Sequence, residues 1–291
     1  MAKHGKRQKK RSRGCLGRLV LLLFLCAAGL WFFRYSNDTL QVTSAEFSSA
    51  QLPAAFDGCR IAVLSDLHGK EFGEGNADLG EALTALSPDY IFFTGDFVDR
   101  STDEPLRYIA ATGAMLSDIA PTYYVTGNHD WDCTCGIKEL KQTLCDAGVT
   151  VLGNEYMTLT REGETILLAG IDDPNGYANQ KSPEALAEEV SALSPDFWIL
   201  LAHRNDRFRE QYSLLGADLT VSGHAHGGLI RLPLLGGLFG NNGTFFPEDT
   251  EGFCEANGST LLVSRGLGNS GHTFRLFNRP EIIDLTLKQE G

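Results

Sequence analysis

Residues 90–100 read YIFFTGDFVDR, and no other stretch says as much about how the chain folds. A short apolar run stops abruptly at Gly95, and two carboxylates, Asp96 and Asp99, follow at once. A continuous apolar run of this length suits a strand that is buried on both faces. Gly at the bend lets the backbone turn sharply and lets a ligand approach closely. The stretch therefore predicts a buried strand whose end presents Asp96 to a site.

Four further apolar runs end in the same way, with Asp, Asn or His directly after the run. Residues 60–65 lead into Asp66-Leu67-His68, 122–126 into Gly127-Asn128-His129-Asp130, 197–202 into His203, and 218–222 into Gly223-His224-Ala225-His226. Five of the seven histidines lie in these motifs. Sites in open α/β sheets form at the carboxyl ends of the strands, so we expect these side chains to converge on one crevice. A single Asp-X-His is a weak signal, whereas an ordered set of five strand ends indicates a built site.

The segments between these runs have helical patterning. Apolar residues recur at helical spacing in four of them, namely 76–86, 104–118, 136–147 and 183–193. Another buried strand is predicted at 165–170, with further strands near 259–264 and 281–287. Residues 36–58 are polar and rich in Ser, which predicts a linker and a leading edge strand. This alternation predicts an α/β protein in which two sheets are sandwiched between helices.

The ordered strand-end motifs resemble the calcineurin-like metallophosphoesterase superfamily, over roughly residues 58–289. Later segments, HAHGG at 224–228 with RLP at 231–233 and SRGLGNSG at 264–271, are similar to its bacterial membrane-associated branch of the YkuE/YaeI type. The resemblance implies a four-layer αββα sandwich with two mixed β-sheets for residues 59–291. It also implies a phosphoric ester hydrolase of phosphodiesterase or pyrophosphatase type.

The resemblance further implies two divalent transition metal ions bridged by Asp96. One ion would be held by Asp66, His68, Asp96 and His226, and the other by Asp96, Asn128, His203 and His224. Neutral imidazoles together with hard oxygen ligands suit Mn²⁺, Fe²⁺ or Fe³⁺, or Zn²⁺ better than Ca²⁺. A hydroxide held between two such ions is a nucleophile near neutral pH, because metal binding lowers the pKa of water. The expected reaction is in-line attack on the phosphorus of a phosphoester.

His129, Asp99 and Arg100 lie in these motifs but match no ligand position. By the same resemblance, His129 stabilises the transition state or protonates the leaving alkoxide, and Asp99 orients its ring. Arg100 completes a motif that also resembles the protein Ser/Thr phosphatases, in which Arg grips phosphate, although a solvated loop residue is the default interpretation. Two alternatives therefore stay open, a phosphoprotein phosphatase and a non-catalytic metal-binding scaffold.

The N-terminal residues differ sharply from the body. Residues 1–34 carry nine Lys or Arg and no Asp or Glu, whereas 35–291 carry 16 basic and 37 acidic residues, a formal charge of −21. The basic residues 1–18 precede an apolar segment at 19–35, which is short for a bilayer core that needs about 20 residues. An uncleaved transmembrane signal anchor is favoured over a signal peptide cleaved near 26–28, because apolar residues continue past that point. The positive-inside rule then predicts a single-pass cell-membrane protein with a cytoplasmic N-terminus and an extracytoplasmic catalytic domain.

The expected partners are the membrane and a phosphoester substrate. The acidic body would repel a phosphate backbone, which excludes general nucleic-acid binding, and no obligate protein partner is evident. Residues 229–240 read LIRLPLLGGLFG, an unusually apolar stretch next to two expected ligands. It is interpreted as a buried loop, with a substrate wall that accepts an acyl chain or touches the bilayer as the alternative. Such an anchored enzyme could act on a lipid-linked or envelope phosphate.

Five cysteines lie outside the basic start and the apolar segment, namely Cys59, Cys133, Cys135, Cys145 and Cys254. The favoured interpretation is small buried or loop residues, because Cys133-Thr134-Cys135 has the wrong spacing for a zinc knuckle. A disulfide from Cys133 or Cys135 to Cys145 is the alternative for an extracytoplasmic body.

Overall fold

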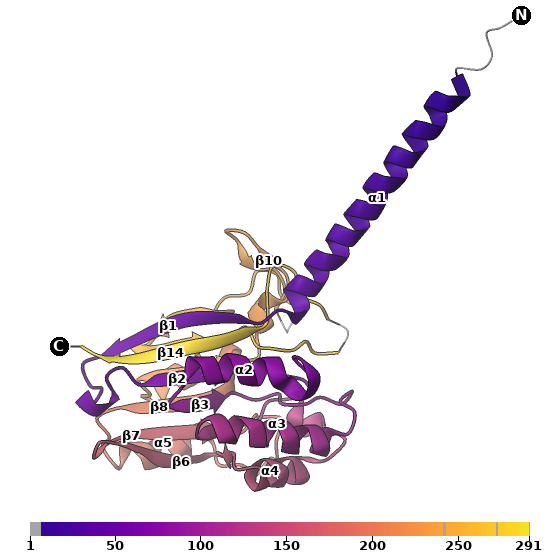
Figure 1. Ribbon diagram of the computed structural model, residues 1–291. Coiled ribbons are helices and arrows are strands. Elements are labelled where there is room, and N and C mark those ends of the chain that lie inside the picture. The colour runs from indigo at the N-terminus through magenta and orange to yellow at the C-terminus, as the bar shows by residue number, and fades with distance from the viewer. Residues whose placement is uncertain (1–6, 241–242, 272, 291) are drawn as a thin grey trace, which may run out of the picture.

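A computed structural model describes residues 7–240, 243–271 and 273–290 of the chain. Two six-stranded sheets pack face to face, and helices cover their outer faces (Figure 1). The predicted α/β sandwich with two mixed sheets is confirmed. Residues 1–6 of the predicted basic N-terminus lie outside the described residues.

The first sheet has the strand order β1-β14-β2-β3-β4-β5. Its strands, in that order, are Gln41–Ser49, Glu281–Gln289, Arg60–Leu64, Tyr90–Phe93, Thr122–Tyr124 and Thr150–Val151. β14 runs antiparallel to β2, and the other neighbours are parallel. The carboxyl ends of β2, β3 and β4 therefore lie along one edge, and the Asp66, Asp96 and Asn128 motifs follow them directly.

The second sheet has the strand order β12-β13-β9-β8-β7-β6. Its strands, in that order, are Gly252–Ala256, Ser259–Val263, Leu219–Gly223, Trp198–Arg204, Glu164–Ile171 and Glu155–Arg161. The two edge pairs are antiparallel and the three inner pairs are parallel. Because β8 and β9 are adjacent and parallel, His203 and the motif from His224 to His226 meet at one edge of this sheet.

Alternate residues of the buried strands enter different cores. Ile61 and Val63 of β2 pack between the sheets, whereas Ala62 and Leu64 pack against the outer helices. Those helices are α2 (Ala77–Leu86), α3 (Pro105–Ile119) and α4 (Ile137–Asp146) over the first sheet, and α5 (Pro183–Ser191) over the second. All four helices begin and end within two residues of their predicted bounds. Each fully buried aliphatic side chain contributes about 1.5–3 kcal/mol, so these cores hold the strand ends in fixed positions.

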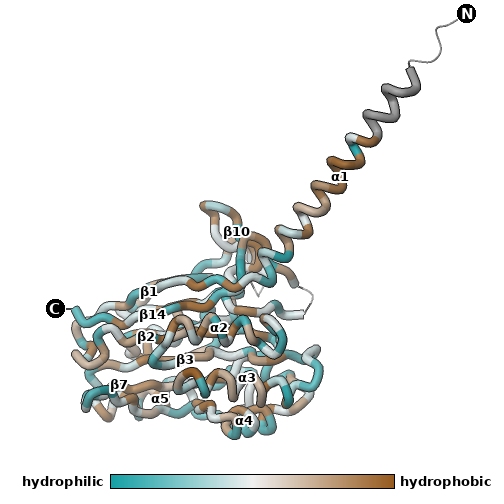
Figure 2. The backbone as a smooth tube through the Cα atoms, in the orientation of Figure 1, coloured by the Kyte–Doolittle hydropathy of each residue, from teal (hydrophilic) through white to brown (hydrophobic). Residues whose placement is uncertain are grey.

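The N-terminal helix α1 spans Arg7–Asp38 and projects away from the body (Figure 1). Its segment Leu16–Asp38 is long and apolar enough to cross a bilayer, and its most apolar part is not buried by the body. Figure 2 shows apolar residues dominating this segment. The helix extends beyond the predicted 19–35 at both ends, because the flanking polar residues continue its turns. The predicted linker reduces to the two residues between α1 and β1.

A short hairpin of β10 (Arg231–Leu232) and β11 (Gly236–Gly237) projects from the end of the body that carries α1 (Figure 1). It belongs to neither large sheet. The backbone of Arg231 donates a hydrogen bond to the carbonyl of Leu276 at 3.0 Å, which attaches the hairpin to the segment before β14.

Candidate metal centre

The first group of converging side chains comes from the ends of β2, β3 and β9. Asp66 Oδ1 lies 3.5 Å from His226 Nε2. His68 Nε2 lies 3.2 Å from His226 Nε2 and 3.6 Å from Asp96 Oδ2. All four residues are buried. The structure thus brings together the four residues predicted to share one metal ion.

The second group meets the first at Asp96. Asp96 Oδ2 lies 3.3 Å from His203 Nε2. His203 Nε2 in turn lies 3.1 Å from His224 Nδ1 and 3.3 Å from Asn128 Oδ1. These are the four residues predicted for the other ion, and one oxygen of Asp96 faces both groups.

The backbone around the centre is strained. Five of the seven predicted ligands have φ between 46° and 68°, namely Asp66, His68, Asp96, His224 and His226. Each non-glycine residue in this left-handed region costs about 1–3 kcal/mol, and such residues concentrate at functional sites. Glycines allow the close approach, because a Cβ on Gly127 would lie 2.2 Å from Asp96 Oδ1. The strand ends are therefore built to crowd these side chains together.

The protonation of the imidazoles suits cation binding. His203 Nδ1 must donate to the carbonyl of Thr94 at 2.7 Å, which leaves the Nε2 lone pair for the centre. Burial lowers the pKa of His68 to about 4, and burial followed by the Arg275 charge lowers the pKa of His226 to about 3. Burial opposes charge on His203 as well, but the Asp96 carboxylate raises its pKa to about 10, so a cation at the centre would have to displace the proton from Nε2 of this ring.

The donor set fits divalent cations. Three groups of His and Asp residues each place their ligand atoms within 4.8 Å of one another, and Asp96 belongs to two of them. In two places a pair of imidazole nitrogens face each other, at 3.2 Å for His68 and His226 and at 3.1 Å for His203 and His224. A cation between such nitrogens would use both lone pairs, and neutral imidazole is the form that binds metal.

The structure gives Asp99 and His129 different neighbours from those predicted. Asp99 Oδ2 lies 3.9 Å from His68 Nδ1, so it faces the outer nitrogen of an expected ligand and not the ring of His129. His129 Nε2 lies 3.2 Å from Ser270 Oγ, and the His129 backbone N–H donates to Asp96 Oδ1 at 2.8 Å. Ser270 is therefore a neighbour of His129 that the sequence did not predict, and the role of Asp99 in orienting the His129 ring stays a prediction. The loop after β3 turns Asp99 toward β2, which sequence spacing alone does not show.

Arg100 lies outside the centre. Its side chain is 75% exposed and lies 3.7 Å from Asp132 in an exposed ion pair. The only sequence feature that favoured a phosphoprotein phosphatase is thus a solvated loop residue, as the default interpretation had it.

Three residues around the centre were not singled out from the sequence. The buried Asp130 accepts backbone N–H groups from the loop after β3 and from the loop after β4. Arg204 is held by Asp173 through Nε at 2.6 Å and Nη2 at 3.2 Å. Arg275 is fully buried, and its Nη2 lies 3.3 Å from His226 Nδ1. The position of Asp130 in the Gly-Asn-His-Asp motif was an available signal, whereas Arg275 follows an irregular segment without any pattern.

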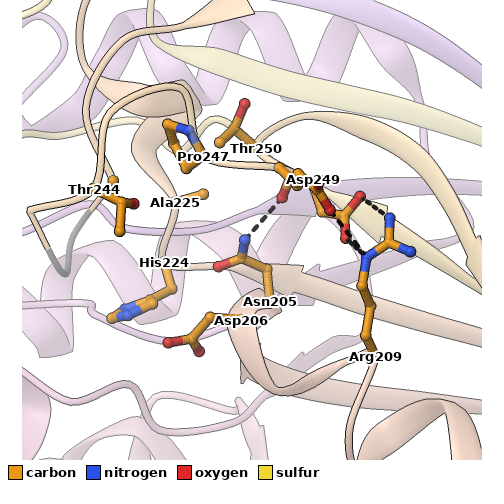
Figure 3. A pocket seen from close by; sticks show the side chains of 11 residues that line it. Asn205, Asp206, Arg209, His224, Ala225, Thr244, Pro247, Asp249 and Thr250 are labelled. Carbon is orange, nitrogen blue, oxygen red and sulfur yellow. Dashed lines mark hydrogen bonds and ion pairs between the residues drawn. The ribbon is translucent and has the colours of Figure 1, made fainter.

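Two adjoining cavities open over the centre. The catalytic cavity has a volume of about 430 Å³ and is lined by Asp96, Asn128, His129, Arg204 and Ser270, among others. A neighbouring cavity of about 220 Å³ shares Asp206, His224 and Gly240 with it. Figure 3 shows polar side chains such as Asn205 and Asp206 lining this second cavity beside the apolar Ala225 and Pro247, with Arg209 turned toward Asp249. A substrate larger than a phosphate group thus has space on the side of His224.

Two cysteines near the centre form a disulfide. Cys133 and Cys135 are bonded to each other, with Cα atoms 5.3 Å apart. Cys145 is free and exposed. The alternative of a bond to Cys145 is therefore wrong, whereas Cys133 is buried and Cys135 is half-buried in the same loop, as the favoured interpretation expected. The bonded pair lies a few residues after His129, close to the second group of ligands.

The sequence also matches a known family. A family model described as calcineurin-like phosphoesterase matches residues 59–228, more than half of the chain, including all seven converging side chains. The chain belongs to the calcineurin-like phosphoesterase family. This calcineurin-like phosphoesterase is 30% identical to the metallophosphoesterase YkuE of Bacillus subtilis over 292 residues, covering 96% of this chain and 99% of YkuE.

Two further relatives bear on activity and on the membrane. The phosphodiesterase YaeI of Escherichia coli is 31% identical over 235 residues, covering 78% of this chain and 82% of YaeI. A transmembrane protein with metallophosphoesterase domain from Danio rerio is 28% identical over 260 residues, covering 86% of this chain and 57% of that protein. As a calcineurin-like phosphoesterase, the chain is a metal-dependent hydrolase of phosphoric esters, so the scaffold alternative is set aside.

Proposed function

We propose that the protein is a membrane-anchored phosphoesterase that works with two metal ions on a phosphodiester or a pyrophosphate. One ion would be held by Asp66, His68, Asp96 and His226, and the other by Asp96, Asn128, His203 and His224. The observation that carries this proposal is the position of Asp96 Oδ2, which lies 3.6 Å from His68 Nε2 and 3.3 Å from His203 Nε2. A carboxylate oxygen between two imidazole groups is suited to bridge two cations.

Divalent ions such as Mn²⁺, Fe²⁺ or Zn²⁺ would supply an activated water molecule and neutralise phosphoryl charge. The chain supplies the remaining functions. The strained strand ends hold the ligands before substrate binds, and Arg204 lines the cavity as a cation for phosphoryl oxygens. His129, with Ser270 beside its Nε2, would give a proton to the leaving alkoxide.

We also infer the membrane arrangement. Residues 1–18 would remain in the cytoplasm, 19–35 would form the core of a single-pass anchor, and 36–58 would lead into a metallophosphoesterase domain at 59–291. The unburied apolar segment of α1 and a transmembrane relative support the anchor, and the basic N-terminus supports the orientation. A lipid-linked or envelope phosphate is the substrate class that suits this location.

An Asp96→Asn variant tests the proposed chemistry. Hydrolysis of bis(p-nitrophenyl) phosphate by the full chain in detergent should fall more than about 100-fold, beyond the loss typical of changing an outer partner of a metal ligand. Asp206→Asn is the matched control, because Asp206 lines the cavity without belonging to the ligand groups. Mass spectrometry of bound metal should show two ions in the control and fewer in Asp96→Asn. Undiminished hydrolysis by Asp96→Asn would remove the basis for the two-metal reaction.

A further inference from the structure

The end of α1 is fixed to the body by buried hydrogen bonds. Asn37 is 5% exposed; its Nδ2 donates to the carbonyl of Arg275 at 3.0 Å, and its Oδ1 accepts the N–H of Arg275 at 2.8 Å. Asn269 Nδ2 donates to the same Oδ1 at 3.1 Å. Lys70 donates to the carbonyl of Asn37 and lies 3.3 Å from Asp38. These bonds fix the orientation of α1 relative to the body. The part of α1 that lies in the bilayer therefore determines which part of the body reaches the lipid.

Two contacts between α1 and the body indicate which residues of the body lie at the level of the bilayer. Arg279 stacks 4.8 Å over the ring of Tyr35 and donates to its hydroxyl at 3.2 Å. Tyr and Arg at the end of a span usually lie at the level of the lipid headgroups. Three residues earlier on α1, Phe32 contacts Phe277 with ring centroids 4.8 Å apart. At about 1.5 Å per helical residue, Phe32 lies about 4.5 Å nearer the bilayer centre than Tyr35. Phe277, a residue of the body, therefore lies beside the span itself.

Four exposed apolar side chains, which we name the apolar crest, lie at this end of the body: Leu234, Leu235, Phe274 and Phe277. They are 105%, 64%, 43% and 58% exposed, respectively. Leu234 and Leu235 form the tip of the β10–β11 hairpin, which projects at the end of the body that carries α1 (Figure 1). The interpretation of residues 229–240 as a buried loop is therefore wrong at its tip.

The backbone conformations of Leu234 and Phe277 do not favour large apolar side chains at these positions. Leu234 has φ of 69° and Phe277 has φ of 54°. Turns in this left-handed region ordinarily use Gly, Asn or Asp, and a bulky side chain there is strained. The two residues thus combine backbone strain with apolar surface exposed to water, and neither stabilises the body by itself. A contact that covers the crest would offset both costs.

The apolar crest and the metal centre are connected. A cavity of about 380 Å³ is lined by Phe33 of α1 and Phe274 of the crest, whose rings lie 5.9 Å apart, and also by His68. The catalytic cavity is bordered by Leu229 and Thr273, which belong to the two segments that carry the crest. Whatever surface receives the crest is therefore next to the catalytic cavity.

We propose that the apolar crest inserts into the bilayer surface beside α1, so that the catalytic cavity receives phosphoesters carried by lipids of the same leaflet. The inference rests on the proposed membrane span of α1, and it narrows the proposed substrate to membrane-borne phosphoesters. Apolar side chains in such a position enter the boundary between headgroups and acyl chains by about 5–10 Å. A lipid substrate keeps its tails in the bilayer while its phosphate reaches Asp96.

Tryptophan quenching in nanodiscs tests the insertion. Full-length Leu234→Trp and Leu193→Trp proteins are compared with the unsubstituted chain in nanodiscs with and without brominated phosphatidylcholine. Leu193 is a matched exposed leucine that follows α5, on the far side of the body from α1 (Figure 1). Brominated lipid should strongly quench the fluorescence of the tryptophan introduced at position 234. It should not quench that of the tryptophan introduced at position 193. Quenching of the unsubstituted chain, which has Trp31 in α1, reports the anchor separately.

Equal and weak quenching at 234 and 193, with the anchor signal intact, would overturn the proposal. The proposal would also be overturned if the protein is a dimer in detergent and Leu234→Glu makes it a monomer. A second copy of the chain would then cover the crest.

Substrate comparison tests the consequence. Leu235→Glu should lower turnover of phosphatidyl-p-nitrophenol embedded in the nanodisc about tenfold, the effect expected for withdrawing a leucine from lipid. Turnover of soluble bis(p-nitrophenyl) phosphate should stay unchanged, as should both activities of a Leu193→Glu control. Equal effects of Leu235→Glu on the two substrates would contradict the proposal. If the unsubstituted protein hydrolyses neither substrate, the proposed function fails, and the quenching experiment still decides the insertion.

Discussion

A carboxylate oxygen of Asp130 accepts the backbone N–H of Asp96 at 2.9 Å, so a residue outside the predicted ligand set holds the proposed bridging residue in place. The same carboxylate accepts the N–H groups of Phe97 at 2.9 Å and Gly127 at 2.7 Å. It therefore ties the loop after β3 to the loop after β4. Burial, followed by the charge of Asp96, raises the pKa of Asp130 to about 7. The position of Asp96 thus depends on a carboxylate that solvent does not reach.

Replacing Asp130 with Asn should damage both stability and activity. An amide nitrogen would face backbone N–H groups and leave them unpaired in a buried site, which costs about 2–3 kcal/mol. Urea unfolding of the full chain in detergent measures the loss, and hydrolysis of bis(p-nitrophenyl) phosphate should fall with it. Asp132→Asn is the control, because the Asp132 side chain is 61% exposed two residues later. Equal unfolding midpoints for the two variants would show that Asp130 has no such role.

Arg204 and Arg100 should differ in importance. Arg204 lines the catalytic cavity and is fixed by Asp173, whereas Arg100 is exposed. Loss of a charge-assisted hydrogen bond costs about 1.5–3 kcal/mol, so kcat/KM of Arg204→Ala for a diester should fall about tenfold to a hundredfold. Arg100→Ala should stay close to the unsubstituted enzyme. A larger loss in Arg100→Ala, especially on phosphoprotein substrates, would revive the phosphoprotein phosphatase alternative.

The convergence of the strand-end side chains could be predicted from the sequence because a strong local pattern marks each strand end, whereas the family resemblance supplied which of them were expected as ligands. Asp66, Asp96 and His203 each follow a continuous apolar run, and such a run is typical of a strand buried on both faces. Parallel neighbours then bring the strand ends to one edge without further information. The weaker strands could not be read in this way. β6 and β12 lie at sheet edges with alternating or exposed residues, and β5 has only two residues.

The partners of the ligands were harder to predict, because they depend on how loops turn. Asp99 lies in the right motif but faces His68, since the loop after β3 directs it toward β2. Ser270 and Arg275 come from an irregular segment far along the chain, where no periodicity indicates which side chains point inward. Their contacts with His129 and His226 arise only once both sheets are packed.

The cysteines should react in a defined order. Burial raises the pKa of Cys59 to about 11, which leaves about one thiolate in a thousand at pH 8. Cys145 is free and exposed, so iodoacetamide should modify Cys145 well before Cys59. Cys133 and Cys135 should react only after reduction. Mass spectrometry of tryptic peptides measures each site. Modification of Cys133 without reductant, or rapid modification of Cys59 in the folded protein, would contradict this placement.

Asn37 should matter to catalysis although it lies at the end of α1, the proposed membrane helix. It holds the backbone of Arg275 and the side chain of Asn269, and the segment between them carries Ser270, the neighbour of His129. Asn37→Ala leaves buried backbone groups of Arg275 unpaired, so the free energy of unfolding should fall by about 2–3 kcal/mol.

A measurement well below the melting temperature separates a catalytic effect of Asn37→Ala from simple unfolding. There kcat should fall although the protein stays folded, because His129 loses its fixed neighbour. Ser36→Ala is the matched control, since Ser36 is equally buried at the adjacent position and its hydroxyl has no hydrogen-bond partner among the described residues. Removing that hydroxyl should leave stability unchanged or raise it slightly. If both variants behave alike, the end of α1 serves only to attach α1 to the body.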